Sequence, residues 1–212
     1  MDYRVLIQAN FNKAVDYRVL IQANFNKSRI LEYKLSKEPP NQKVPTEPAR
    51  WCCPPPNVVK LNVDAAIASD FSTLAVIARD SNGNILKAWA KRSSHSDPLQ
   101  AETCTILWAL KLAAEESFLH ILVEGDSKIS FDAIQGESTV PWSISSIVSN
   151  LIELRKVFVS CDFCWVGREA NFVAHSLAKF AISSPLDLSC NISSLPHVVC
   201  DAWKMDLLAS AS

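Results

Sequence analysis

Three acidic residues stand where expected secondary structure elements begin or end. Asp64 ends the alternating apolar segment 58–63, Glu102 lies near the start of an expected helix, and Asp126 follows the apolar run 121–123. An aspartate at a strand end can be a turn residue that bonds its own backbone, so each residue alone is weak evidence. Together, their placement predicts three carboxylates that point at one common site.

Glu102 is the least expected of the three carboxylates. Residues 97–100 (DPLQ) already supply the cap and the first turn of the helix, so Glu102 is not needed to begin it. Its neighbours at helical spacing are all apolar: Ile106, Ala109 and Ala113. Burying an unpaired carboxylate costs several kcal/mol, so we expect a cation beside Glu102, unless the side chain lies at the helix edge and reaches solvent.

Clustered carboxylates are the ligands that Mg²⁺ prefers in proteins. Two such ions about 4 Å apart bind the attacking and the leaving oxygens of a phosphodiester. Asp126 has the alternative role of a helix cap, although Ser127 is placed to cap that helix instead. Strand alternation puts Glu124 on the same side as Asp126, so Glu124 is a candidate accessory residue. The pattern favours metal-dependent chemistry on phosphodiesters.

The elements that position these residues have the order of an α/β domain. Strands are expected at 58–63, 72–79, 85–92, 121–123 and 159–166. Helices are expected at 98–116, 127–136, 143–158 and 171–182. An Asn-Gly turn at 80–83 joins the second and third strands into a hairpin. We therefore expect a five-stranded mixed sheet, three antiparallel strands followed by two parallel ones, flanked by helices.

The remaining segments are interpreted from composition and repetition. Residues 2–13 recur unchanged at 16–27, and because repeat folds need about three or more copies, we assign segment 1–35 no part in the core. Residues 36–57 contain seven of the eleven prolines, which predicts a linker, with an SH3-type ligand as the alternative. The folded domain is expected over 58–184 and a C-terminal tail over 185–212.

The composition limits what the chain contacts. Its 212 residues have a net charge of −1, so no global field attracts nucleic acid or a membrane, and any polyanion must bind locally. The sequence has no apolar run of about 18 residues and no signal-peptide pattern at its start, so we expect neither a membrane span nor secretion. The seven cysteines are expected to stay reduced, and the CxxC at 161–164 to be structural. We expect an intracellular monomer, in the nucleus or the cytoplasm, without membrane or protein partners.

Several motifs occur in a characteristic order. They are Trp51 with Pro54-Pro55, KLNVDAA at 60–66, VIARD at 76–80 with Gly83, Ala101-Glu102, VEGDS at 123–127 and REANFVAHSLA at 168–178. In these motifs the sequence resembles the plant ribonuclease H-like domain of non-LTR retrotransposon reverse transcriptases, which also occurs as stand-alone proteins. The resemblance covers residues 51–184. It implies a ribonuclease H fold and metal-dependent hydrolysis of the RNA strand of RNA–DNA hybrids.

By position, the resemblance makes Asp64, Glu102 and Asp126 the catalytic carboxylates that bind two Mg²⁺ ions, with Mn²⁺ as a substitute. The fourth carboxylate of the active enzymes falls at His175, one helical turn from Asn171. His175 is thus expected in the catalytic set as a weak ligand or an outer-sphere group. Packing beside Ala178 is the alternative. Since imidazole is a poor Mg²⁺ ligand, the second ion should bind weakly.

Two further departures concern the surroundings of the expected site. The segment Trp165-Val166-Gly167 lacks the His-x-Gly that many active ribonucleases H carry, which removes a proton shuttle or an aid to product release. Ala65 stands where glycine is usual, so its side chain crowds the backbone beside the first ligand.

Few basic residues are placed to bind a substrate. The candidate nucleic-acid contacts are Lys91, Arg92, Arg168 and Asn171. For Lys and Arg, a solvated face is the commoner explanation. The leading hypothesis is a retroelement-derived endonuclease of the ribonuclease H type, acting on RNA–DNA hybrids. The alternatives are a catalytically weak or inactive domesticated nucleic-acid-binding module, and an inactive remnant.

Overall fold

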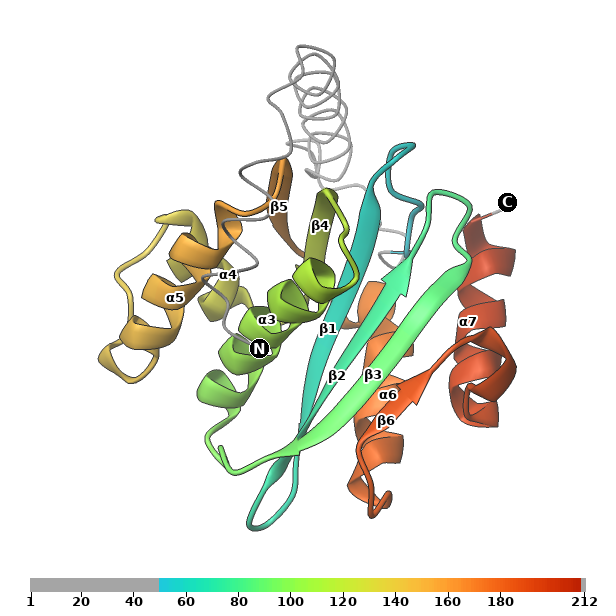
Figure 1. Cartoon of the computed structure of the whole chain (residues 1–212). Coiled ribbons are helices and arrows are strands. Elements are labelled where there is room, and N and C mark those ends of the chain that lie inside the picture. Colours follow the sequence, from blue (N-terminus) through green and yellow to red (C-terminus); the bar gives the residue numbers. More distant parts are fainter. Residues whose placement is uncertain (1–49, 211–212) are drawn as a thin grey trace, which may run out of the picture.

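The computed structural model describes residues 50–210, so the duplicated segment 1–35 and most of the expected linker lie outside the described residues. One mixed sheet with strand order β5-β4-β1-β2-β3-β6 forms the centre (Figure 1). The strands are β1 (Val59–Ile67), β2 (Ser72–Arg79), β3 (Ile85–Ser93), β4 (His120–Gly125), β5 (Ser160–Trp165) and β6 (Leu188–Cys190). Strand β1 pairs antiparallel with β2, β2 with β3, and β3 with β6. Strand β4 pairs parallel with β1, and β5 pairs parallel with β4. The expected α/β class and the order of strand directions are confirmed.

The β2–β3 turn forms for local reasons that the sequence displays. The Asp80 carboxylate accepts hydrogen bonds from the backbone N–H groups of Asn82 and Asn84, both at 2.9 Å. Gly83 has a φ of 81°, a left-handed conformation that glycine adopts without strain. A side chain here would also meet Trp51 and Leu207, so this position requires glycine for space as well as for conformation.

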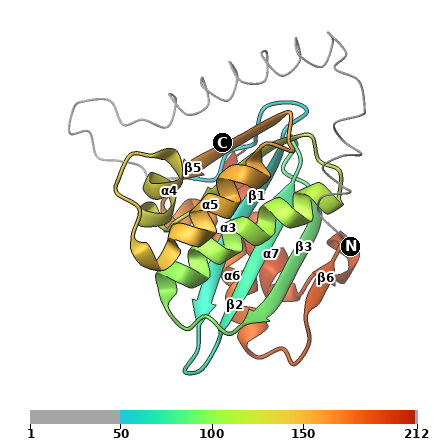
Figure 2. The ribbon, with the colours of Figure 1, turned by 60° about the vertical axis from the view of Figure 1, so that its left-hand side comes forward.

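Helices cover both faces of the sheet. They are α3 (Pro98–Glu115), α4 (Lys128–Gln135), α5 (Ser145–Arg155), α6 (Phe172–Ile182) and α7 (His197–Ser210), with short 3-10 turns η1 (Trp142–Ile144), η2 (Arg168–Asn171) and η3 (Ile192–Ser194). Helices α3, α4 and α5 share one hydrophobic cluster with the sheet, and α6 and α7 share another on the opposite face (Figure 2). Among the described helices, none has both the length and the apolar character that a bilayer crossing requires.

The expectation of five strands is wrong, because the sheet has six. Residues 188–190 pair antiparallel with 88–90 of β3 and extend the sheet at its edge. Three residues are too few for a strand to display a period of two in the sequence. Helix α7 packs against α6 and contributes Val199 and Ala202 to the hydrophobic cluster on that face. The folded region thus extends past residue 184, where the sequence suggests that the domain ends.

The folded region also begins earlier than residue 58. Trp51 is fully buried, and its indole N–H donates to Asn62 Oδ1 on β1 at 3.1 Å. The Arg79 guanidinium stacks on the indole, with its central carbon 3.7 Å from the ring centroid. The last part of the expected linker is therefore packed onto β1 and β2.

Candidate metal centre

Strand pairing brings Asp64 and Asp126 to the same end of the sheet. Asp64 lies in the second half of β1, and its residue is only 2% exposed. Asp126 follows the last residue of β4, which runs parallel to β1. Because parallel strands end at the same edge, the two carboxylates converge.

Glu102 reaches this point from the second turn of α3. The Asp97 carboxylate caps that helix by accepting the Gln100 backbone N–H at 2.8 Å, and Pro98 stands at the first helical position, as expected. The Glu102 carboxylate accepts a hydrogen bond from the backbone N–H of Ala65, the residue after Asp64. Helix α3 is thus joined to β1 at the site.

The three carboxylates form one acidic cluster, defined as Asp64, Glu102 and Asp126. One oxygen from each lies within 4.8 Å of the others. Burial, reinforced by the charges of Asp64 and Asp126, raises the pKa of Glu102 to about 9. Burial also raises the pKa of Asp64, against a hydrogen bond from His175. Within residues 50–210, no Lys or Arg forms an ion pair with any of the three, so the cation that we expected beside Glu102 is not a Lys or Arg side chain of these residues.

His175 lies at the acidic cluster, one turn into α6. Its Nδ1 is 3.0 Å from Asp64 Oδ2. Arg168 Nη2 is 3.1 Å from Nε2 and 3.2 Å from Nδ1 of the same imidazole, so it is about equally close to both ring nitrogens. His175 is therefore placed between Asp64 and the cation of Arg168.

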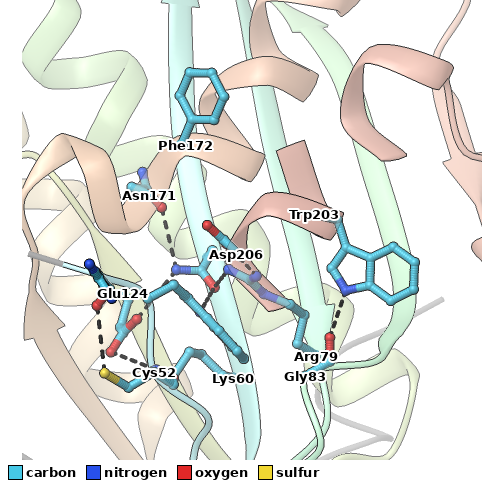
Figure 3. Close-up of polar contacts among 12 residues, drawn as sticks. Cys52, Lys60, Arg79, Gly83, Glu124, Asn171, Phe172, Trp203 and Asp206 are labelled. Atoms are coloured by element: carbon cyan, nitrogen blue, oxygen red, sulfur yellow. Dashed lines mark hydrogen bonds and ion pairs between the residues drawn. The ribbon is translucent and has the colours of Figure 1, made fainter. Parts of the chain in front are cut away.

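A second polar group surrounds Lys60, nearer the start of β1 (Figure 3). Because side chains alternate along a strand, Lys60 lies on the same face of β1 as Asp64. Lys60 Nζ is 3.0 Å from Glu124 Oε1, and both side chains are fully buried. Glu124 is therefore neutralised by a lysine and is not among the residues of the acidic cluster. Its expected role as an accessory to Asp126 is wrong, because β1 supplies a cation directly beside it.

Arg79 completes this second group. Its Nη1 is 2.7 Å from Asp206 Oδ2 on α7, and its Nη2 donates to Asn62 Oδ1 at 2.8 Å. We call the four charged residues Lys60, Arg79, Glu124 and Asp206 the balanced network, since two cations face two carboxylates.

Asn171 connects the start of α6 to β1 in the interior of the protein. Its side-chain amide donates to the Val63 carbonyl at 2.8 Å, and its Oδ1 faces Asn62 Nδ2 at 3.4 Å. The residue is fully buried. The interpretation of Asn171 as a nucleic-acid contact is wrong, because its side chain has no access to a ligand and instead holds the peptide that precedes Asp64.

Sequence and structure comparisons place the chain among known proteins. Residues 62–181 match the reverse transcriptase-like family. This chain belongs to the reverse transcriptase-like family. No curated protein sequence gives a significant match.

Solved ribonucleases H share the fold of this family member. Ribonuclease H1 from the archaeon Halobacterium salinarum is 23% identical, with a TM-score of 0.56 over 59% of this chain and 97% of the archaeal one. A ribonuclease H1 isolated from compost, solved in complex with an RNA/DNA hybrid, is 19% identical, with a TM-score of 0.53 over 59% of this chain and 99% of the other. The fold is therefore ribonuclease H-like.

The candidate basic contacts of this family member are not gathered at one place. Arg168 is exposed and lies at the acidic cluster through His175. Lys91 and Arg92 lie on β3, two strands away from β1. Lys91 Nζ is 4.5 Å from the Trp108 ring centroid, and burial lowers its pKa. Arg92 lies over the Phe71 ring at 4.2 Å.

Two features of the site were not foreseen from the sequence. Ser127 occupies the N-cap position of α4, but its hydroxyl bonds Ser130 Oγ at 2.8 Å instead of a backbone N–H. Trp165, noted in the sequence only because histidine is absent there, donates its indole N–H to the Asp126 carbonyl at 3.1 Å. The only signal for this contact was a large aromatic residue at the end of the last expected strand.

Proposed function

We propose that this chain is a nuclease that depends on divalent metal ions and cleaves the RNA strand of RNA–DNA hybrids. The observation that carries the proposal is the acidic cluster: the buried Asp64 and the half-buried Glu102 and Asp126, with oxygens within 4.8 Å and no Lys or Arg of residues 50–210 paired to them. The ribonuclease H-like fold supports it, and a solved structure of that fold holds an RNA/DNA hybrid.

The residues present fit a hard divalent cation. Asp64, Glu102 and Asp126 offer only oxygen donors, the ligands that Mg²⁺ and Mn²⁺ accept. When bound, such ions activate water and stabilise the charge that develops on the leaving oxygen of a phosphodiester. The protein orients Asp64 through the bond of His175 to Oδ2, and it fixes Glu102 through the N–H of Ala65. Arg168 supplies an exposed positive charge for a phosphate.

The charge of the cluster sets how many ions it binds well. Three carboxylates carry at most three negative charges, whereas two divalent ions carry four positive ones. His175 adds no negative charge where a fourth carboxylate would. We therefore propose two ions, the second bound weakly and better as Mn²⁺, which tolerates imidazole more readily.

A nucleic-acid-binding module with little turnover is the second candidate. The observation in its favour is the His175–Asp64 bond, which occupies one oxygen of a proposed ligand. A retroelement origin, in particular from plant non-LTR elements, is part of both proposals. The family description and the ordered motifs at 60–66, 123–127 and 168–178 support it.

The test is cleavage of a labelled RNA–DNA hybrid by the full chain with Mg²⁺ and with Mn²⁺. Wild type should cleave weakly in Mg²⁺ and better in Mn²⁺. Asp64→Asn should lower the rate by more than about 100-fold, because loss of a direct ligand should exceed the 10- to 100-fold cost of edits around a metal site. The matched control is Asp201→Asn, the same change on the exposed side of α7, which should leave the rate unchanged.

Two results separate the candidates. Hybrid binding without cleavage in either metal favours the binding module. Equal activity of Asp64→Asn and wild type would show that the acidic cluster does not carry the reaction.

A further inference from the structure

Trp165 lies directly beside the acidic cluster. It is the last residue of β5 and pairs with Gly125, the last residue of β4. Its indole N–H donates to the backbone carbonyl of Asp126 at 3.1 Å, and the next residue, Val166, donates its N–H to the Gly125 carbonyl at 3.0 Å. One hydrogen bond from the indole and one from the backbone of the next residue thus attach this position to the segment that carries Asp126, a proposed metal ligand.

The aromatic ring is held in place and yet remains open to solvent. Trp165 is 46% exposed, in contrast to the buried Trp51 and Trp89 of the core. Lys128 Nζ lies 5.8 Å from the ring centroid, so a cation flanks the indole. A side chain that is oriented before binding loses little conformational entropy when a ligand packs against it.

The charge distribution makes a contact of this kind valuable. The chain carries a net charge of −1, and Lys91 is partly buried against Trp108 two strands away from β1, so it adds little attraction for a duplex at the site. Arg168 provides positive charge close to the cluster, whereas Lys128, beside the indole, is paired with Asp132 at 2.9 Å. Uncharged contacts to the nucleotides at the site therefore gain importance for affinity.

We propose that Trp165 stacks on an unpaired base next to the acidic cluster. The preferred substrates are then hybrids or RNAs with an unpaired nucleotide at the cleaved position. Within a fully paired duplex, neighbouring bases cover both faces of each base, so the exposed indole finds a stacking partner only where a nucleotide is unpaired. The inference rests on the proposed function, since it assigns a substrate class to the same site.

The test is binding of labelled probes, measured by fluorescence anisotropy with Ca²⁺ in place of Mg²⁺ to prevent cleavage. One probe is a fully paired RNA–DNA hybrid, and the other is the same hybrid with one unpaired RNA nucleotide. Stacking of one base on an aromatic side chain is worth about 1–3 kcal/mol, which corresponds to about 5- to 140-fold in affinity. Wild type should prefer the second probe by a factor in this range.

Three variants test whether Trp165 causes the preference for the probe with an unpaired nucleotide. Trp165→Phe keeps an aromatic face without the N–H donor and should retain most of it, whereas Trp165→Leu should lose it. Leu119→Ala is the control, because Leu119 is exposed just before β4, at the opposite end of the strand from Asp126, and its loss should change nothing. Far-UV circular dichroism verifies that each variant is folded.

The outcomes distinguish this inference from the proposed function. Equal affinity of wild type for the two probes, or an unchanged preference in Trp165→Leu, overturns the role of Trp165 even if the paired hybrid is cleaved. Absence of any metal-dependent cleavage or nucleic-acid binding removes the proposed function, and the role of Trp165 with it.

Discussion

The acidic cluster and the balanced network share one face of β1 but differ in charge. In the network, Lys60 and Arg79 neutralise Glu124 and Asp206. Four residues beyond Lys60 on the strand, Asp64 belongs to the acidic cluster, whose three carboxylates have no Lys or Arg of residues 50–210 paired to them. Because an uncompensated buried charge is costly, this difference supports the proposal that the acidic cluster binds a cation from solution.

The largest effect is expected from breaking the balance of the network. Lys60→Met leaves Glu124 fully buried without its lysine, and loss of one partner of a buried pair costs about 3–5 kcal/mol. The measurement is the free energy of unfolding by urea, without added metal.

The matched variants make the comparison sharper. Lys60→Met/Glu124→Leu should regain much of the lost stability, because no charge is left unpaired. Asp64→Asn should not lower stability in the absence of metal, since it removes a buried carboxylate whose charge repels that of Asp126. If Lys60→Met and Asp64→Asn destabilise equally, the two regions do not differ as described.

A smaller effect is expected from adding charge to the acidic cluster. His175→Asp should raise the affinity for the second Mg²⁺ by about 10- to 100-fold, comparable to other edits around metal sites. The measurement is a Mg²⁺ titration of the hybrid cleavage rate. His197→Asp, at the exposed start of α7, is the control. If His175→Asp cleaves no faster than wild type at any Mg²⁺ concentration, position 175 is not where a ligand is missing.

A further effect is a pH dependence of stability in metal-free protein. Burial raises the pKa of Glu102 from 4.5 to about 9. Below pH 4.5 the carboxyl group is protonated in both the folded and the unfolded state. Between pH 4.5 and about 9 only the folded state keeps the proton, so stability falls as the pH rises, and the loss is complete above about 9.

Thermal unfolding across this pH range, with and without Mg²⁺, tests the dependence. Glu102→Gln cannot titrate and should show a weaker decline than wild type. The stabilisation by Mg²⁺ should grow with pH, because the ion competes with the proton for the carboxylate. A decline of the same size in both proteins would assign the pH dependence to other groups.

The strands and helices around the site were predictable because their signals are local. The Asp97 cap, the Asn-Gly turn and the apolar run at 121–123 each determine an element within a few residues. The resemblance, not a local signal, assigned His175 to the site, and its Nδ1 lies 3.0 Å from Asp64 Oδ2. The position of all three carboxylates therefore followed from where elements begin and end.

The partners of buried charges were not predictable, because they depend on contacts between distant segments. Lys60 and Glu124 meet only through the register of β1 with β4, in which Asn62 lies opposite Glu124. Alternation gave the correct face for Glu124 but not the lysine that neutralises it. The environment of Asn171 was not predictable either. The sequence of a polar residue at a helix start is the same whether its side chain faces solvent or, as here, bonds a buried carbonyl.

The Arg79–Asp206 pair joins positions 127 apart in the sequence. During synthesis, the arginine is incorporated long before its carboxylate, so the described interior is complete only after α7 has been made. A translation product that stops before residue 206 buries Arg79 without that counter-charge and opens more readily. Since cellular proteases degrade proteins that open readily, such truncated products should be short-lived.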